Sequence, residues 1–181
     1  MVYLVRHGQT DWNLFKRCNG CTDTYLNRTG LSQAKTQADN LRNVNFDACF
    51  CSPQTRARQF CEIILKNHQS SAVFDDRLAE INCGEFEGKE ETPEMMNLYW
   101  KAIQNGSMGT EKFDDFIKRS CDLCDMISEE YDLKDKNILI VTHAANARVI
   151  NYYFTGKNKD YDFGKPISET GGLIIFDNSK I

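Results

Sequence analysis

The chain opens with an apolar run, residues 2–5, that stops at Arg6, His7 and Gly8. A short apolar run predicts a buried strand, and ligands of an open α/β sheet bind just outside the carboxyl ends of its strands. Arginine binds phosphate as a bidentate fork, neutral histidine is a competent nucleophile near pH 7, and glycine lets the backbone approach a ligand closely. Because such a tripeptide occurs by chance in many proteins, this interpretation depends on the other groups that the chain supplies.

A second segment of the same type consists of the apolar run 46–51 and the residues that follow it. Ser52 and Pro53 predict a helix start, with the serine as N-cap and the proline in the first turn. Arg56 then falls in the first turn of this helix, whose positive end favours an anion.

Three more segments complete the set. Residues 76–88 predict an acidic loop with two glycines, and residues 137–142 predict a β-branched strand that ends at a second histidine, His143. Asn13 continues the opening motif. Together these segments provide cations, carboxylates and imidazoles for a single anion site.

The order and spacing of these segments resemble those of the histidine phosphatase superfamily, which includes cofactor-dependent phosphoglycerate mutases and α-ribazole phosphatases. The matching patterns are R-H-G-x-T-x-x-N at 6–13, S-P-x-x-R-A at 52–57, L-x-E-x-x-x-G-x-x-E-G at 78–88, and a strand ending in T-H at 142–143. They are spread over nearly the whole chain.

The resemblance implies a role for each matching residue. His7 would be the nucleophile that becomes phosphohistidine, and Glu80 would be the proton donor. Arg6, Arg56 and His143 would form the phosphate pocket. The expected substrate-binding positions, which include backbone N–H groups after His143, are Asn13, Asn19, Gly20 and Ala144. The family often has Gly-Gly after the second histidine; Ala144 and Ala145 stand there in this chain, which narrows the space near the phosphate but leaves the N–H groups.

The same chemistry follows from the residue types. A phosphoester attacked by neutral His7 needs positive charge around its oxygens; Arg6 and Arg56 supply permanent charge, and His143 supplies a donor that responds to pH. The leaving alcohol needs a proton, which a partly desolvated carboxyl can hold near neutral pH. We therefore expect neither a metal nor a cofactor.

Several nearby residues have competing interpretations. From the residues alone, Glu85 and Glu87 compete with Glu80 as the acid, and the motif favours Glu80. Arg58 is best interpreted as a solvated residue of the first turn. For Arg148 a surface salt bridge and a substrate contact are equally compatible with the sequence, and His68 is assigned no chemistry.

Eight cysteines raise the possibility of a metal or redox site. Cys18 and Cys21, like Cys121 and Cys124, form C-x-x-C pairs, the spacing of half a zinc site. The pairs are far apart in sequence, and Cys124 falls at helical spacing among apolar residues, so we interpret the cysteines as structural. Thiols in this number, with a first strand that leaves no room for a signal peptide, predict a reducing cytoplasm.

Length and charge restrict the partners. At 181 residues the chain predicts one domain, 1–181, and its net charge of −4 argues against general nucleic-acid binding. No stretch approaches the roughly 20 apolar residues of a membrane span, so the expected partner is a small-molecule phosphate ester. The sequence does not predict the oligomeric state.

Strand and helix signals alternate. They predict strands at 1–6, 46–51, 72–74, 137–142 and 173–176, helices at 29–42, 53–67 and 144–155, and a helical insert over the active site at about 90–132. This alternation is typical of a three-layer α/β/α sandwich with a largely parallel central sheet.

Within the family, the first question is phosphatase against mutase. Mutases carry a tyrosine shortly after the acid and an arginine pair farther on, whereas Ile81 follows Glu80 here and the insert holds no such pair. An acidic entrance would repel a sugar bisphosphate; its residues would be Glu85, Glu87, Glu90, Glu91 and Glu94. We therefore expect a metal-independent phosphomonoesterase, with a mutase as the alternative and a non-catalytic phospholigand-binding module as the alternative from another class.

Overall fold

The computed structural model describes residues 1–177, in which five strands form one sheet of order β3-β2-β4-β1-β5. Neighbouring strands are parallel except for β1 and β5, which are antiparallel. The strands are β1 (Val2–Arg6), β2 (Ala48–Cys51), β3 (Ala72–Phe74), β4 (Ile138–Thr142) and β5 (Leu173–Phe176). Parallel pairing of β1 and β4 places the carboxyl ends of two central strands side by side.

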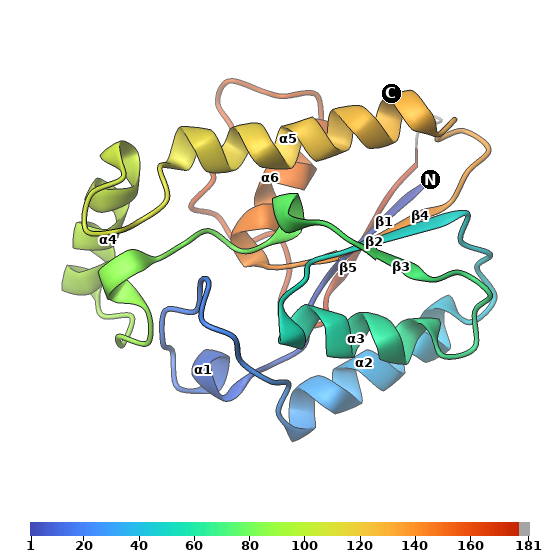
Figure 1. Ribbon diagram of the computed structural model, residues 1–181, viewed down its shortest axis with the longest axis horizontal. Helices are drawn as coiled ribbons and strands as arrows, with labels where there is room; N and C mark the ends of the chain where they lie inside the picture. Colours follow the sequence, from blue (N-terminus) through green and yellow to red (C-terminus); the bar gives the residue numbers. More distant parts are fainter. Residues whose placement is uncertain (178–181) are drawn as a thin grey trace.

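Helices cover both faces of this sheet. In Figure 1, α2 and α3 lie on one side of the strands and α5 and α6 on the other, which confirms the predicted α/β/α sandwich. The helices are α1 (Asp11–Leu14), α2 (Arg28–Leu41), α3 (Thr55–Leu65), α4 (Pro93–Asn105), α5 (Phe113–Glu130) and α6 (Ala144–Phe154), with short 3-10 turns η1 (Asp76–Leu78) and η2 (Gly84–Phe86). No helix in residues 1–177 is long and apolar enough to cross a membrane.

The alternation of side chains along β1 explains the layers. Val2 and Leu4 belong to the core formed with α5 and α6, whereas Tyr3 and Val5 belong to the core formed with α2 and α3. Successive side chains of a strand point to opposite faces, so a continuous apolar run buries both faces of a central strand.

The predicted helical insert is only partly a cover for the site. Its second helix, α5, packs on the sheet beside α6 through Leu123, Cys124 and Ile127. Within the insert, only α4 and the amino end of α5 extend beyond the sheet in Figure 1. The insert therefore supplies one helix of a layer as well as one wall of the site.

Ser52 is not the helix cap that the sequence predicted. Helix α3 begins at Thr55 after Gln54, which makes no capping side-chain bond. The Thr55 N–H instead donates to Asp23 Oδ1 at 2.8 Å. A carboxylate from a loop more than thirty residues away therefore occupies the N-cap role. The Ser52 hydroxyl accepts from the Gln54 N–H at 3.3 Å, one residue before the helix, and also contacts His143.

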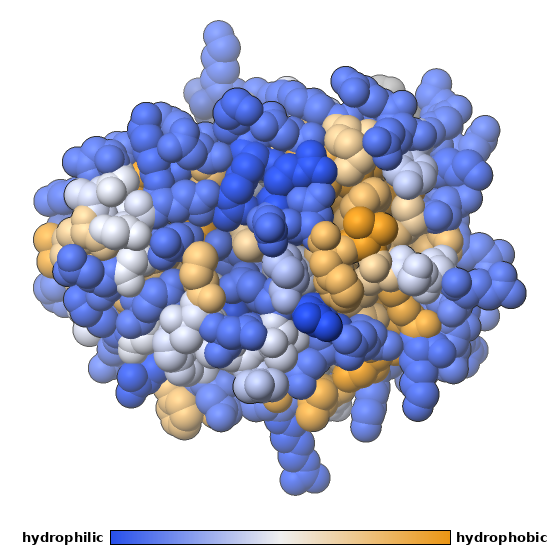
Figure 2. All heavy atoms as spheres, in the orientation of Figure 1, coloured by the Kyte–Doolittle hydropathy of each residue, from blue (hydrophilic) through white to orange (hydrophobic). Residues whose placement is uncertain are grey.

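The edge strand β3 carries an exposed apolar patch. Val73 and Phe74 are exposed, and Figure 2 shows hydrophobic surface over this edge. The strand has three residues, and the Arg58 guanidinium lies 4.8 Å from the centre of the Phe74 ring. The shortness of this edge strand and the Arg58 cation of α3 beside it both oppose edge-to-edge pairing.

Candidate active site

The two predicted site histidines lie together because β1 and β4 are neighbours. Arg6 is opposite Thr142 in the strand register, and the His7 N–H donates to the Thr142 carbonyl at 2.9 Å. The rings of His7 and His143 follow these strand ends with centroids 5.0 Å apart. Residues more than 130 positions apart in the chain thus form one site.

The hydrogen bonds of His7 select the tautomer of its ring. His7 Nδ1 lies 2.7 Å from the Gly8 carbonyl oxygen, and because a carbonyl only accepts, Nδ1 carries the proton. In the neutral ring Nε2 is then unprotonated and carries a lone pair, the state that a nucleophile needs. Burial, together with the charges of Arg56 and Arg6, holds the His7 pKa well below its ordinary value, so the ring is neutral near pH 7.

Gly8 allows the nucleophile loop to pack closely against α2. A Cβ added at Gly8 would lie 2.6 Å from the Gly30 carbonyl oxygen, and one added at Gly30 would lie 2.2 Å from the Gln9 oxygen. Two glycines are therefore required where the loop after β1 crosses the start of α2.

Arg56 is fully buried behind His7. Its Nε donates to His7 Nε2 at 3.3 Å, and its Nη atoms donate to backbone carbonyls, including that of Gly20 at 2.8 Å. Burial lowers the Arg56 pKa, and the nearby Glu80 and Asp23 carboxylates oppose that shift. Arg56 is therefore a fixed positive charge aimed at the nucleophilic nitrogen.

The sequence predicted that His143 supplies a hydrogen-bond donor whose protonation changes with pH, and the surroundings of the ring do not support this near pH 7. Its Nε2 lies 2.7 Å from Ser52 Oγ. Burial, followed by the charge of Arg56, holds the His143 pKa well below its ordinary value. The ring is therefore neutral near pH 7, and any hydrogen bond it donates comes from the neutral imidazole.

Glu80 occupies the helix end that the sequence assigned to the phosphate. It is only 7 % exposed, and its Oε2 accepts from the Ala145 N–H at 3.0 Å. Its Oε1 accepts from the N–H groups of Ile81 at 3.1 Å and Asn146 at 3.3 Å. The positive amino end of α6 thus holds a carboxylate of the protein, because that end attracts any anion within reach.

The two competing carboxylates have other surroundings. The Glu87 carboxylate accepts from the backbone N–H groups of Cys21 at 2.7 Å and of Gly20 and Cys83 at 3.2 Å each. It therefore ties the loop after α1 to the acidic loop. Neither Glu85 nor Glu87 lines the cavity beside His7, whereas Glu80 does.

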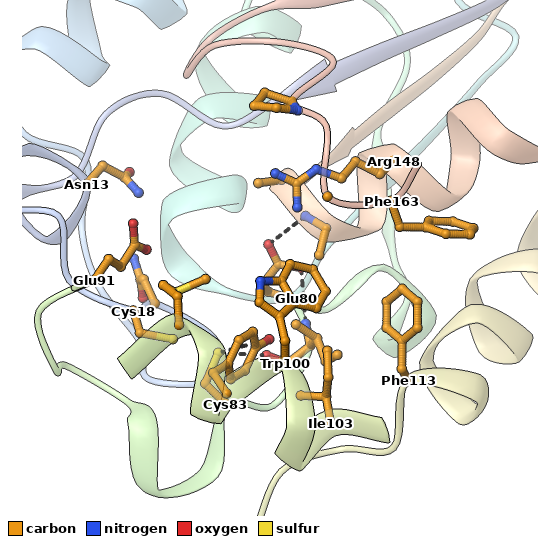
Figure 3. Close-up of a pocket in the computed structure, with 18 of the residues that line it drawn as sticks. Asn13, Cys18, Glu80, Cys83, Glu91, Trp100, Ile103, Phe113, Arg148 and Phe163 are labelled. Carbon is orange, nitrogen blue, oxygen red and sulfur yellow. Dashed lines mark hydrogen bonds between the residues drawn. The ribbon is translucent and has the colours of Figure 1, made fainter. Parts of the chain in front are cut away.

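A cavity of about 340 Å³ opens beside His7 (Figure 3). The predicted site residues that line it are Arg6, His7, Asn13, Asn19, Glu80 and Ala144. Arg56 and His143 lie behind His7, outside the lining. Gly20 does not reach the cavity either, because its carbonyl faces Arg56.

The acidic entrance is largely absent from the cavity wall. Of the five glutamates expected there, only Glu91 lines the cavity. Arg17 and Arg148 line it as well, so its arginines, with Arg6, outnumber its carboxylates. For Arg148 the structure therefore favours a substrate contact over a surface salt bridge.

Two groups of site residues were missed by the sequence analysis. Gln54 connects the loops, because its Nε2 donates to the Gly20 carbonyl at 2.7 Å and its Oε1 accepts from the Glu80 N–H at 2.8 Å. The other group is an aromatic wall, which consists of Tyr99, Trp100, Phe113 and Phe163. The role of Gln54 could not be predicted, because its partners are remote in sequence. The aromatic residues of α4 and α5 resembled those of ordinary apolar helix faces.

All eight cysteines are free thiols. Cys124 is fully buried in the core, as predicted, whereas Cys21 is exposed. Among residues 1–177, no group of three or more histidine, cysteine or acidic side chains is arranged to hold a metal ion. The cytoplasmic compartment expected from these thiols stays a prediction.

Comparison with known proteins gives a family match over nearly the whole chain. The family model described as histidine phosphatase superfamily (branch 1) matches residues 2–175. The uncharacterized phosphatase PhoE of Bacillus subtilis is 32% identical over 148 residues, which cover 80% of this chain and 72% of PhoE. A probable 2-carboxy-D-arabinitol-1-phosphatase of Arabidopsis thaliana is 39% identical over 106 residues, 57% of this chain, and the match spans only 22% of that protein.

A solved structure shares the same architecture. YhfR of Bacillus stearothermophilus superposes with a TM-score of 0.80 at 26% identity and covers 95% of this chain and 88% of its own. This likeness extends over nearly the whole chain.

Proposed function

The chain belongs to the histidine phosphatase superfamily (branch 1), and from this premise we propose that it hydrolyses a small-molecule phosphate monoester through a phosphohistidine at His7. The single observation that carries the proposal is the hydrogen bond from His7 Nδ1 to the Gly8 carbonyl in a buried site. It leaves Nε2 unprotonated beside the Arg56 guanidinium and next to a cavity of substrate size.

In the first step, Nε2 of His7 attacks the phosphorus atom. The N–P bond forms as the bond from phosphorus to the leaving oxygen breaks. Glu80, in the protonated form of the carboxyl group that accepts the α6 N–H groups, gives its proton to that oxygen. The products are a free alcohol, a phosphohistidine and a Glu80 carboxylate. Arg6 and Arg56 offset the charge on the transferred oxygens. When Ser52 Oγ donates to Nε2 of the neutral His143 ring, the Nδ1 of that ring, which has no partner among the described residues, can donate one further hydrogen bond.

In the second step, a water molecule attacks the phosphohistidine. Glu80 takes a proton from that water as its oxygen bonds to phosphorus and the N–P bond breaks. Inorganic phosphate leaves, and both His7 and Glu80 return to their starting states. Arginines supply the positive charge in both steps, so the proposed reaction has no step that depends on a metal.

Two of the relatives are named as phosphatases and others as probable phosphoglycerate mutases, and the match to the Arabidopsis protein covers only part of that protein's length. The substrate is therefore not carried over from them. Asn13 and Asn19 are proposed as substrate contacts because both line the cavity.

Rapid quench with small phosphate esters in excess EDTA tests the proposal. We expect phosphate release and an acid-labile phosphoenzyme, both lost in His7→Ala and both kept in His68→Gln, with equal circular dichroism for the two variants. A phosphoenzyme in His7→Ala, or activity that needs added zinc or magnesium, would contradict it. Phosphate transfer to phosphoglycerate with added bisphosphoglycerate would instead identify a mutase, and binding without turnover would identify a binding module.

A further inference from the structure

One side of the cavity lining is aromatic. Figure 3 shows Trp100, Phe113 and Phe163 on one side and Asn13 and Glu91 on the other. The three rings come from α4, from the first residue of α5 and from the segment between α6 and β5. The fold therefore brings them together from three separate places at the mouth of one site.

The rings form a continuous, supported wall. The centroids of Trp100 and Phe113 are 6.4 Å apart, and those of Phe113 and Phe163 are 5.4 Å apart, both with edge-to-face geometry. Phe163 is further held by Tyr161 and Tyr152, with centroids at 4.8 and 5.2 Å. Because the rings support one another, their exposed faces are preorganised for a ligand.

The three rings remain partly exposed although each belongs to an aromatic cluster. Tyr99, the fourth member of the aromatic wall, is buried and lines the same cavity with Met96 and Ile103. An apolar cavity lining with a few polar groups at one side is the usual form of a small-molecule site, in which the apolar part binds the body of the ligand.

The cations of the cavity are positioned for the phosphate. Arg6 Nε is buried without a hydrogen-bond partner among the described residues, and Arg148 forms no hydrogen bond or ion pair with them. The charge of Arg148 contributes to the lowered pKa of Arg6, after burial, so the two guanidinium groups are near each other. A phosphate bound between them satisfies both, which leaves the aromatic wall for the rest of the substrate.

We propose that the substrate is the phosphate monoester of an alcohol that carries an aromatic ring, and that Trp100 and Phe163 select this ring. The proposal rests on the function proposed above for His7 and adds the chemical class of the leaving group. The edges and faces of the wall favour an aromatic ring over a saturated ring of similar size, because aromatic pairs gain from edge-to-face geometry beyond the area they bury.

Ethyl, 2-cyclohexylethyl and 2-phenylethyl phosphate separate the effect of apolar burial from that of aromatic pairing. All three are primary alkyl esters, so their leaving alcohols are chemically alike. We expect kcat/KM for 2-phenylethyl phosphate (below, the phenylethyl ester, from which the phenyl-to-ethyl ratio is taken) to exceed that for ethyl phosphate by about tenfold or more, because its ring is buried. Its kcat/KM should also exceed that of 2-cyclohexylethyl phosphate by about twofold to tenfold. A phenyl-to-ethyl ratio near one overturns the proposal, and so does a cyclohexyl ester that is hydrolysed as well as the phenylethyl ester.

Substitutions in the aromatic wall test whether it causes the preference for the aromatic ester. Trp100→Leu and Phe163→Leu should each lower the phenyl-to-ethyl ratio by about tenfold. Leu98→Ala is the matched control, since Leu98 lies on the same helix but is 55% exposed and outside the cavity lining. An unchanged ratio in both wall variants overturns the assignment.

A binding measurement separates this proposal from the catalytic one. By calorimetry, 2-phenylethylphosphonate, which cannot be hydrolysed, should bind the wild type about tenfold more tightly than ethylphosphonate, and Trp100→Leu should remove that difference. Tight aromatic binding without any phosphoenzyme would contradict the function proposed for His7 and keep the ligand class. A phosphoenzyme together with equal affinity for both phosphonates would support the function proposed for His7 and contradict the proposed ligand class.

Discussion

Glu80 has two tasks that a single side chain must combine. Its carboxylate oxygens accept three backbone N–H groups, two of them from the amino end of α6, and the same side chain lines the cavity beside His7. The helix end thereby fixes the Glu80 side chain in the cavity that His7 also lines. Its anchoring distinguishes it from Glu87, whose contacts hold two loops together.

We predict that Glu80→Gln slows the hydrolysis of alkyl phosphates by about a hundredfold or more, because an amide cannot give a proton to the alkoxide. Formation of the phosphoenzyme from an aryl phosphate should suffer less, since a phenolate leaves with little help. Burst and steady-state phases measured separately for both substrate types check this expectation.

Glu85→Gln is the matched control, because Glu85 belongs to the same acidic loop but does not line the cavity. It should retain both phases. Equal losses of the burst with aryl and alkyl esters in Glu80→Gln would remove Glu80 from the role of the acid.

At the scale of elements, α3 depends on a residue outside itself. Arg56 lies in its first turn, and the helix start is fixed by Asp23, which accepts from both the N–H and the hydroxyl of Thr55. The neighbouring Thr22 carbonyl accepts from Arg56 Nη1 at 3.1 Å. One loop thus caps the helix and orients its arginine.

We predict that Asp23→Ala lowers the free energy of unfolding by about 1 kcal/mol, the usual cost of a lost N-cap. Urea denaturation at pH 7 measures the change. Asp39→Ala removes an exposed carboxylate of α2 and should have a smaller effect. A loss of stability that is the same for both variants would mean that Asp23 does not cap α3.

For the whole molecule, the buried histidines couple the site to acid stability. The pKa values of His7 and His143 are lowered in the fold, mainly by burial. Between pH about 6.5 and these lowered values, the unfolded chain therefore binds more protons than the folded chain. The contribution to stability is fully present above about pH 6.5 and is lost as the pH falls below it.

We predict that the free energy of unfolding falls between pH 6.5 and 5 by up to about 1.4 kcal/mol per pH unit for each buried histidine. His143→Asn should reduce this slope by up to the contribution of one proton, whatever its effect on stability at pH 7. Urea unfolding at a series of pH values gives the slopes, and His68→Gln serves as a control because that ring is only partly buried. Identical slopes in the wild type and His143→Asn would contradict the prediction.

The sequence by itself determined the strands and the longer helices, whereas the short helix α1 was not predicted. Apolar runs and helical spacing are local properties, so the strands, the layers and the positions of Arg6, His7 and His143 at strand ends followed from them. The chain order of the strands, joined by helices, also required a mostly parallel sheet. The antiparallel edge strand β5 was the exception, since its direction depends on the segment that leads into it.

Only the tertiary structure decided which groups meet. Ser52 contacts His143 instead of capping α3, Glu80 instead of a phosphate takes the end of α6, and Gln54 connects two loops. The aromatic wall joins three separate segments. The partner of a polar or aromatic side chain depends on which groups lie near it and on how deeply it is buried in the folded chain. Neither property can be read from the local pattern of residues that predicts helices and strands.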